Sequence, residues 1–203
     1  MLSSKNSWLL LAAALLVPAF YVDGRVVDFV RSFNTADTEF SRAARAVHDV
    51  ISTVSHGSVL LLLSFLIYAA GRYFRNRGAI LGRDLIVGFL VSGAAVQILK
   101  RLAGRARPRI TDHVMFIGPT LQIDYDSFPS GHTTSAFCLA YLASYHFPRH
   151  RPFFFTLAAL IGIDRIYGMS HFPADVLAGA LLGLIIGRVL TDTILKDKST
   201  PAG

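Results

Sequence analysis

The sequence predicts an all-α protein, an integral membrane bundle of six transmembrane helices with an amphipathic helix at the membrane interface. Hydrophobic residues make up 53% of the 203 residues and charged residues only 16%, against about 25% charged in ordinary soluble domains. Six apolar stretches approach the roughly 20 residues that a helix needs to cross a bilayer. They run over 7–23, 54–71, 84–103, 131–147, 152–169 and 174–194. Several carry Gly and Ala at close spacing, which lets helix backbones pack together.

The first stretch has two interpretations. Lys5 followed by the apolar run from Trp8 to Val17 predicts a first membrane helix. The same run, ending in Val17-Pro18-Ala19, is also typical of a cleaved secretory signal. Cleavage would leave the topology of the other helices unchanged, and we expect the helix to be retained.

The segment 23–53 is too polar to span a membrane. Its apolar residues recur at helical spacing, and its charged residues occupy other faces. The apolar set is Phe40, Ala43, Ala44, Val47, Val50 and Ile51, and the charged set is Arg42, Arg45 and Asp49. This pattern predicts a helix lying along the outer interface. A loop helix that covers the end of the bundle is an equally good interpretation, and the two are compatible.

The remaining stretches are joined by loops that set the orientation. The basic residues are spread between apolar blocks, so the formal charge of +7 indicates anionic lipid headgroups rather than nucleic acid as partners. Denser basic residues in the shorter loops predict that both termini lie inside.

The single cysteine, Cys138, lies in an apolar stretch and is expected to be a small core residue. We expect one domain, 1–203, and leave its oligomeric state open.

Three cations fall at one end of the predicted bundle. Lys100 ends the third stretch, Arg107 follows seven residues later, and Arg165 lies near the end of the fifth. An unpaired charge in a membrane helix costs a few kcal/mol, and any one of them alone would be interpreted as a side chain reaching the interface. Two guanidinium forks and one ammonium together predict a phosphate site. The neighbouring arginines are expected to form a basic collar at the interface: Arg101, Arg105 and Arg109.

The motif Pro129-Ser130-Gly131-His132 precedes the fourth stretch. Free backbone N–H groups at a helix start, with Gly131 letting the chain come close, make an anion cradle. An ordinary turn with Ser130 as N-cap is the alternative. The motif alone is weak evidence, and its weight comes from the cations that share its end of the bundle.

A histidine and a carboxylate open the sixth stretch. Asp175 lies four residues beyond His171, within one helical turn. A carboxylate that accepts the proton of one imidazole nitrogen leaves the other nitrogen free to attack. His132 can then donate a proton to the leaving oxygen and later accept one from water. On its own, the pair would be interpreted only as stabilising a helix start.

This ordered set of motifs resembles the signature of the type-2 phosphatidic acid phosphatase family. The matching positions span 100–175 and are Lys100, Arg107-Pro108, Pro129-Ser130-Gly131-His132, Arg165, His171 and Asp175. The resemblance implies a phosphohistidine at His171, with His132 as acid and then base and Asp175 orienting His171. It implies no metal and no cofactor, and it assigns the phosphate to Lys100, Arg107, Ser130, Gly131 and Arg165.

One position departs from the family pattern. Asp164 stands where the family usually has serine, and this acid could pair with Arg165 or tune the cleft.

The other histidines lack a spaced partner and are expected in loops or at the interface: His48, His56, His113, His146 and His150. For Asp124, Tyr125 and Asp126, a solvated loop is favoured over contact with a headgroup.

The motifs predict a bacterial inner-membrane lipid phosphatase whose site faces the periplasm. It would hydrolyse a phosphomonoester or diphosphate, with undecaprenyl diphosphate, phosphatidylglycerol phosphate, phosphatidate and lipid A as candidate substrates. A lipid-to-lipid phosphotransferase using the same phosphohistidine is the nearest alternative, and a non-catalytic headgroup binder is another. The soluble vanadium haloperoxidases carry a similar phosphate pattern, but the six apolar stretches argue against them.

Overall fold

The structure, a computed structural model, describes residues 7–36, 38–111 and 115–195. These residues form helices and contain no β-strand, which confirms the all-α class. The α-helices are α1 (Ser7–Thr35), α2 (Glu39–Val54), α3 (Gly57–Tyr73), α4 (Gly78–Ala103), α5 (Gly131–His146), α6 (Arg151–Tyr167) and α7 (Pro173–Leu190). A 3-10 turn, η2 (Pro148–His150), and a π-helical turn, η3 (Thr191–Leu195), complete the described chain.

The first helix is longer than the sequence predicts. Polar Asp23 was expected to end it, but α1 continues through Asp23 to Thr35. The expectation is wrong because the Asp23 carboxylate is fully buried and paired inside the protein. The helix expected within 23–53 is therefore α2, which begins after a short break. Thr38 caps it, accepting a hydrogen bond from the Ser41 backbone N–H at 3.1 Å.

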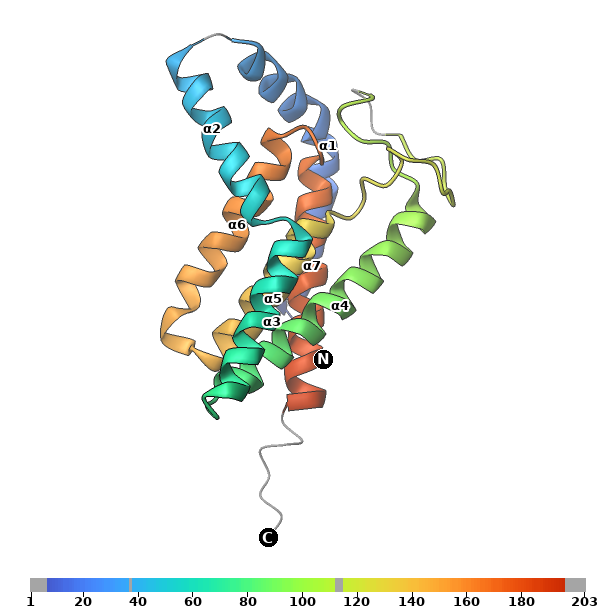
Figure 1. The fold of residues 1–203 in the computed structure, drawn as a ribbon. Helices are drawn as coiled ribbons and strands as arrows, with labels where there is room; N and C mark the ends of the chain where they lie inside the picture. The colour runs from blue at the N-terminus through green and yellow to red at the C-terminus, as the bar shows by residue number, and fades with distance from the viewer. Residues whose placement is uncertain (1–6, 37, 112–114, 196–203) are drawn as a thin grey trace.

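Helix α5 lies at the centre of the bundle, packed against α4, α6 and α7, while α3 packs on α4 and α1 on α7 (Figure 1). Small residues allow the closest of these approaches. A Cβ at Gly179 of α7 would lie 2.6 Å from the Ser130 carbonyl oxygen, and one at Gly183 would lie 2.9 Å from the Cys138 nitrogen. Cys138 is fully buried against α4, which confirms it as a core residue.

Many large apolar side chains face outward, and much of the interior is made of small or polar side chains. Leu62, Phe65, Leu90, Ile98 and Ile163 are each at least half exposed, whereas the interior contains Ala136, Ala140, Ser92, Thr133 and Ser135. This distribution differs from that of a soluble domain, in which large hydrophobic side chains are mostly buried in the core. Such a surface is suited to contact with an apolar surrounding.

Two described stretches are long and apolar enough to cross a membrane, Gly78–Ala103 and Pro173–Thr193. A third results if α2 and α3, which meet at a bend of 52°, count as one span. Helices α3, α5 and α6 have 17, 16 and 17 residues, fewer than the roughly 20 of a typical span. Six spans are thus not confirmed, and they stay a prediction.

The chain direction brings the sequence motifs to one end of the bundle. The last turn of α4, the start of α5, the end of α6 and the start of α7 meet at the end of the bundle opposite the last turn of α7 (Figure 1). Helix α2 lies beside α6 at the same end. The helical spacing predicted for α2 is confirmed, and its place along a membrane surface stays a prediction.

Candidate active site

Lys100 and Arg107 approach one another from two sides of a turn. Lys100 lies in the last turn of α4 and is 7% exposed. Gly104 ends this helix in the left-handed conformation, at φ +57°, and its N–H donates to the Lys100 carbonyl. The chain then runs extended, so that the Arg107 N–H donates to the Asp124 carbonyl at 2.9 Å. Glycine suits this cap because it adopts positive φ without strain.

Asp126 binds both of these cations. Arg107 donates to it through Nε at 2.8 Å and Nη2 at 3.0 Å, and Lys100 Nζ lies 3.5 Å from Oδ2. Burial works against ionisation of Asp126, but the hydrogen bonds and charges of Arg107 and Lys100 outweigh it and hold the pKa of the carboxyl well below its usual range. The expectation of a solvated loop is wrong for Asp126, because backbone pairing in the loop places it beside Arg107.

Ser130 and Gly131 form the start of α5. Ser130 is buried at the N-cap position, and its N–H donates to the Asp175 carbonyl at 3.0 Å, joining α5 to α7. Its hydroxyl accepts from Thr133 at 2.9 Å and makes no capping bond. A Cβ at Gly131 would meet Val96 at 3.5 Å and Lys100 Cε at 4.0 Å, which is ordinary contact. Packing alone does not demand glycine there, so the backbone is open on the side of the pocket.

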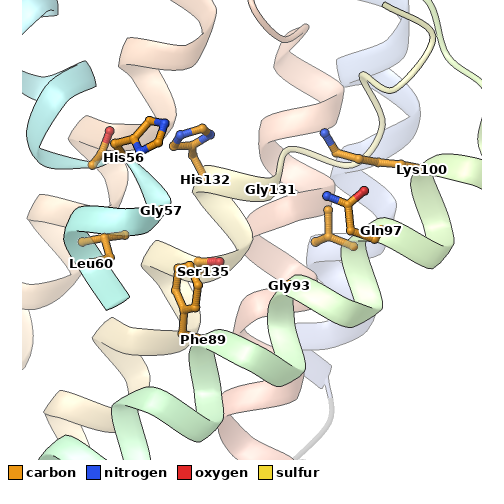
Figure 2. A pocket seen from close by; sticks show the side chains of 12 residues that line it. His56, Gly57, Leu60, Phe89, Gly93, Gln97, Lys100, Gly131, His132 and Ser135 are labelled. Carbon is orange, nitrogen blue, oxygen red and sulfur yellow. The ribbon is translucent and has the colours of Figure 1, made fainter. Parts of the chain in front are cut away.

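A pocket of about 310 Å³ opens in front of this turn, between α3, α4 and α5, at the small end of ligand pockets, which range over ≈ 300–1,000 Å³. Figure 2 shows His132 and His56 on one side and Lys100 on the other. The His56 and His132 rings meet edge-on, with centroids 6.3 Å apart. Away from these polar groups the wall becomes apolar, with Leu60 and Phe89. A polar end and an apolar wall suit an amphiphilic ligand.

His171 and Asp175 lie together at the start of α7. His171 is 2% exposed, and its Nδ1 is 3.6 Å from Asp175 Oδ2 and 3.5 Å from Ser127 Oγ. These distances are longer than an ordinary hydrogen bond, as is common in ligand-free sites. Asp175 also accepts from Ser127 Oγ at 2.6 Å and from the Phe172 N–H at 2.9 Å. It therefore stabilises the helix start and faces the histidine at once.

Burial lowers the pKa of the His171 imidazole, although the nearby Asp175 carboxylate works in the opposite direction. The charges of Lys100 and Arg107 add to the lowering. A neutral imidazole is the form with a lone pair available for attack. The surroundings of His171 thus favour the reactive form.

Arg105 is the main correction to the expected site. It was expected in an exposed basic collar, but its side chain is fully buried and bridges Asp175 and Asp23. Its guanidinium also lies over the rings of Phe20, Phe116 and Phe172, at 4.9, 5.2 and 4.3 Å. The segment turns it inward because the Arg105 carbonyl pairs with the Ser127 N–H. Arg101 is exposed and Arg109 half exposed, as the collar predicts.

Two histidines expected without a partner have one. His48 Nδ1 lies 2.6 Å from Asp164 Oδ1, and Arg165 binds the other oxygen of the same carboxylate. His146 Nε2 lies 2.8 Å from Asp84 Oδ2 at the opposite end of the bundle. Helix packing brings these pairs together over more than 60 positions of sequence. His113 lies outside the described residues.

The structure brings the predicted site residues to one place. Lys100 and His132 line the same pocket, the charges of Arg165 and Lys100 act on His132, and those of Lys100, Arg107 and Asp175 act on His171. Across 7–36, 38–111 and 115–195, no group of three or more His, Cys, Asp or Glu side chains has an arrangement that could hold a metal ion.

A sequence model of the PAP2 superfamily matches residues 81–198, more than half of the chain. The chain belongs to the PAP2 superfamily. Its similarity extends to the lipid A 1-phosphatase of Rhizobium etli, at 35% identity over 51% of this chain and 46% of that protein. It also extends to phosphatidylglycerophosphatase B of Bacillus subtilis, at 29% identity over 75% of this chain and 80% of that one.

Among solved structures, the Aquifex aeolicus LpxE crystal structure is similar to this PAP2 chain with a TM-score of 0.59 and 28% identity. The match covers 81% of this chain and 93% of that one. The sequence match to the Rhizobium etli lipid A 1-phosphatase, in contrast, spans less than half of that protein's length. The PAP2 fold is thus shared along most of the described bundle.

Sequence reasoning missed three side chains of this PAP2 site: Arg105, Asp126 and Ser127. Each lies in the loop between α4 and α5, where no helical period links a residue to its neighbours. One signal was available, since Asp126 and Ser127 directly precede the motif at 129–132. The inward turn of Arg105 had no such signal.

Proposed function

We propose that this chain is a membrane lipid phosphatase that works through a phosphohistidine at His171. The observation that carries the proposal is the meeting of Lys100, Arg107 and Arg165 with His132 and His171 at one end of the bundle, beside a half-apolar pocket. Cations alone would suit a headgroup binder. The two histidines and the buried Asp175 give a reason to expect a reaction.

In the first step, His171 Nε2 attacks the phosphorus atom and a P–N bond forms. Asp175 and Ser127 face His171 Nδ1 at 3.6 and 3.5 Å, so the tautomer with its proton on Nδ1 would leave Nε2 with its lone pair. The P–O bond to the lipid breaks as His132 donates a proton to the leaving oxygen. Lys100, Arg107 and Arg165 neutralise the charge that grows on the phosphoryl oxygens.

In the second step, water attacks the phosphorus and the P–N bond breaks. His132, now neutral, accepts a proton from that water, and inorganic phosphate leaves. The site returns to its starting protonation state, so atoms and protons balance over one cycle. Transfer to a second lipid instead of water would use the same intermediate, and only the product distinguishes the two reactions.

The surroundings support a lipid as the leaving group. The pocket passes from His132 and Lys100 to Leu60 and Phe89 between α3 and α4, which would let an acyl chain remain in the bilayer. The names of the relatives, lipid A 1-phosphatase and phosphatidylglycerophosphatase B, indicate that those proteins act on lipid phosphates of this kind. The substrate class we propose is a phosphomonoester or diphosphate of a membrane lipid, including undecaprenyl diphosphate and phosphatidate.

We further propose that α1 and α3 to α7 all cross a bacterial inner membrane, with the site at its periplasmic face. The 16- and 17-residue helices would be about 25 Å long. That is somewhat short of the ~30 Å hydrocarbon core, a mismatch that local thinning and long flanking side chains accommodate at modest cost. The outward-facing large apolar residues supply the lipid-facing surface.

The test is phosphate release by the purified protein in detergent micelles. Phosphatidate, phosphatidylglycerol phosphate, undecaprenyl diphosphate and lipid A are offered in turn, with lipid products analysed in parallel. Wild-type protein should release inorganic phosphate from at least one, and His171→Ala should abolish it. Normal release by His171→Ala would refute the mechanism, and a phosphorylated acceptor lipid in place of free phosphate would show transfer.

A further inference from the structure

Asp164, which stands where serine is usual in the family, is a buried carboxylate shared by two residues. Its Oδ1 accepts from His48 Nδ1 at 2.6 Å, and its Oδ2 binds Arg165. Asp164 is 4% exposed and Arg165 is 6% exposed. We call these three residues the Asp164 cluster. It joins α2, which carries His48, to α6, which carries the other two.

The histidine of the Asp164 cluster is held from the other side as well. The rings of His48 and Tyr167 have centroids 5.4 Å apart. Gly168 makes room for the imidazole, because a Cβ there would lie 2.5 Å from His48 Cε1 and 3.0 Å from Nε2. Local packing therefore sets His48 in the orientation that donates to Asp164.

The arginine of the Asp164 cluster is only partly satisfied. Its Nε is buried and has no hydrogen-bond partner among the described residues. Leaving a buried donor without an acceptor is costly, and a ligand oxygen would supply the acceptor. The Arg165 carbonyl accepts from the His171 N–H at 3.2 Å, and the Arg165 charge acts on His132. The guanidinium thus belongs to the same site as both histidines.

We propose that Asp164 and His48 are positioning residues that hold the Arg165 guanidinium for the phosphate. This inference rests on the proposed function, in which Arg165 binds the phosphoryl oxygens. The Asp164 carboxylate holds one edge of the Arg165 guanidinium through Nη2, so the other N–H groups of the guanidinium keep a fixed direction. The His48 bond fixes the carboxylate in turn, because without it Asp164 is free to rotate about its side-chain torsions. Through His48, the position of α2 sets the position of a phosphate-binding group.

The opposite end of the bundle offers a matched control. There His146 Nε2 donates to Asp84 Oδ2 at 2.8 Å, and Arg83 Nε donates to Asp84 Oδ1 at 2.9 Å. Asp84 is 4% exposed, as Asp164 is. The same three residue types thus meet around a buried carboxylate, at the end of the bundle away from the phosphate site. Substitutions there report what losing such a cluster does to stability alone.

The experiment compares Asp164→Asn, His48→Phe and His48→Gln with the control variants Asp84→Asn and His146→Phe. Binding of inorganic phosphate and of orthovanadate to the purified full chain is measured by the shift in thermal unfolding. Turnover of dioctanoyl phosphatidate gives kcat and KM. Asp164→Asn and His48→Phe should weaken anion binding by about 10- to 100-fold, because small misplacements of a binding group cost rate and affinity on that scale.

His48→Gln should recover part of this loss, since its amide still donates to Asp164. Combining His48→Phe with Asp164→Asn should be no worse than the more severe single change, because both act through Arg165. Gly168→Ala is a second approach that keeps every charge and pushes only the His48 ring away. It should reproduce the His48→Phe loss even if the other variants fold poorly.

The control variants should lower the unfolding temperature and leave anion affinity unchanged. The inference is overturned if Asp164→Asn, His48→Phe and Gly168→Ala keep the wild-type affinity, or lose no more than the controls. If the wild-type protein binds the anions but releases no phosphate from any lipid, the proposed function is refuted. The anion affinities of the variants would still test this inference. A wild-type chain that binds neither anion would refute both.

Discussion

Replacing Asp126 with asparagine should make the site bind anions more tightly. Asp126 accepts two hydrogen bonds from Arg107, at 2.8 and 3.0 Å, and lies 3.5 Å from Lys100 Nζ. Those are the donors that we assign to the phosphate. A substrate must therefore displace a carboxylate before it reaches them, and asparagine is easier to displace.

The size of the effect follows from these contacts. Hydrogen bonds to charged groups contribute about 1.5–3 kcal/mol each, roughly twice the neutral value. Asparagine keeps one acceptor oxygen for Arg107 but loses the charge. The Asp126 side chain is 26% exposed, so solvent screening reduces the difference. We expect a net gain of about 1–2 kcal/mol for an incoming anion, or roughly a 5- to 30-fold tighter inhibition constant.

The assay is inhibition of lipid phosphate hydrolysis by inorganic phosphate and orthovanadate, with thermal unfolding as an independent measure of binding. Asp124→Asn is the control, because it removes the same charge from the same loop. The Asp124 side chain pairs with half-exposed Arg109 rather than with the side chains of Lys100 or Arg107. It should therefore leave both inhibition constants near the wild-type values.

Weaker inhibition of Asp126→Asn would refute this reasoning, since it would mean that Asp126 orients Arg107 for the phosphate instead of competing with it. An effect equal to that of Asp124→Asn would also contradict it. In that case the change would reflect only the net charge of the loop.

Further predictions concern the support of the histidine. Arg105→Met leaves the buried Asp175 carboxylate without its guanidinium and should destabilise the protein by about 3–5 kcal/mol, measured by thermal unfolding; an unchanged unfolding temperature would contradict it. Ser127→Ala removes the hydroxyl that donates to Asp175 and should lower kcat about 10-fold, or 1.4 kcal/mol, with vanadate affinity unchanged as the check. Because the pKa of His171 is lowered by burial and only the neutral ring attacks, the acid limb of kcat/KM should lie below the ordinary histidine value of about 6.5. A limb at or above that pH, in phosphate-release profiles, would count against His171 as the nucleophile.

The sequence predicts the helices well because each carries its own signal. The apolar runs give the places of α3 to α7, and the period in 39–54 gives α2. The end of α1 could not be predicted in this way. Asp23 ends a hydrophobic run in the sequence, but in the protein it meets Arg105, 82 positions later. A charged residue after a hydrophobic run is interpreted as the end of a helix when its distant partner is not known.

The same reasoning explains what was found and missed in the site. His132, His171, Arg165 and Asp175 fall in motifs of fixed spacing, and the structure brings them together. Their roles rest on the proposed chemistry. Asp126 lacked any such spacing, because its partners are set by how the loop folds back on α4. Local sequence patterns predict which side chains share one face or one end of a helix, whereas contacts across a loop depend on the whole fold.

Buried Arg105 and Asp175 affect how the charge around His171 changes during the reaction. Arg105 places one positive charge between the carboxyl groups of Asp23 and Asp175, and Asp175 also faces His171 Nδ1 at 3.6 Å. When His171 Nε2 bonds to phosphorus and Nδ1 keeps its proton, the ring becomes a cation. The Asp175 carboxylate then faces an imidazolium in place of a neutral ring, so its charge stabilises the covalent intermediate more than the resting enzyme.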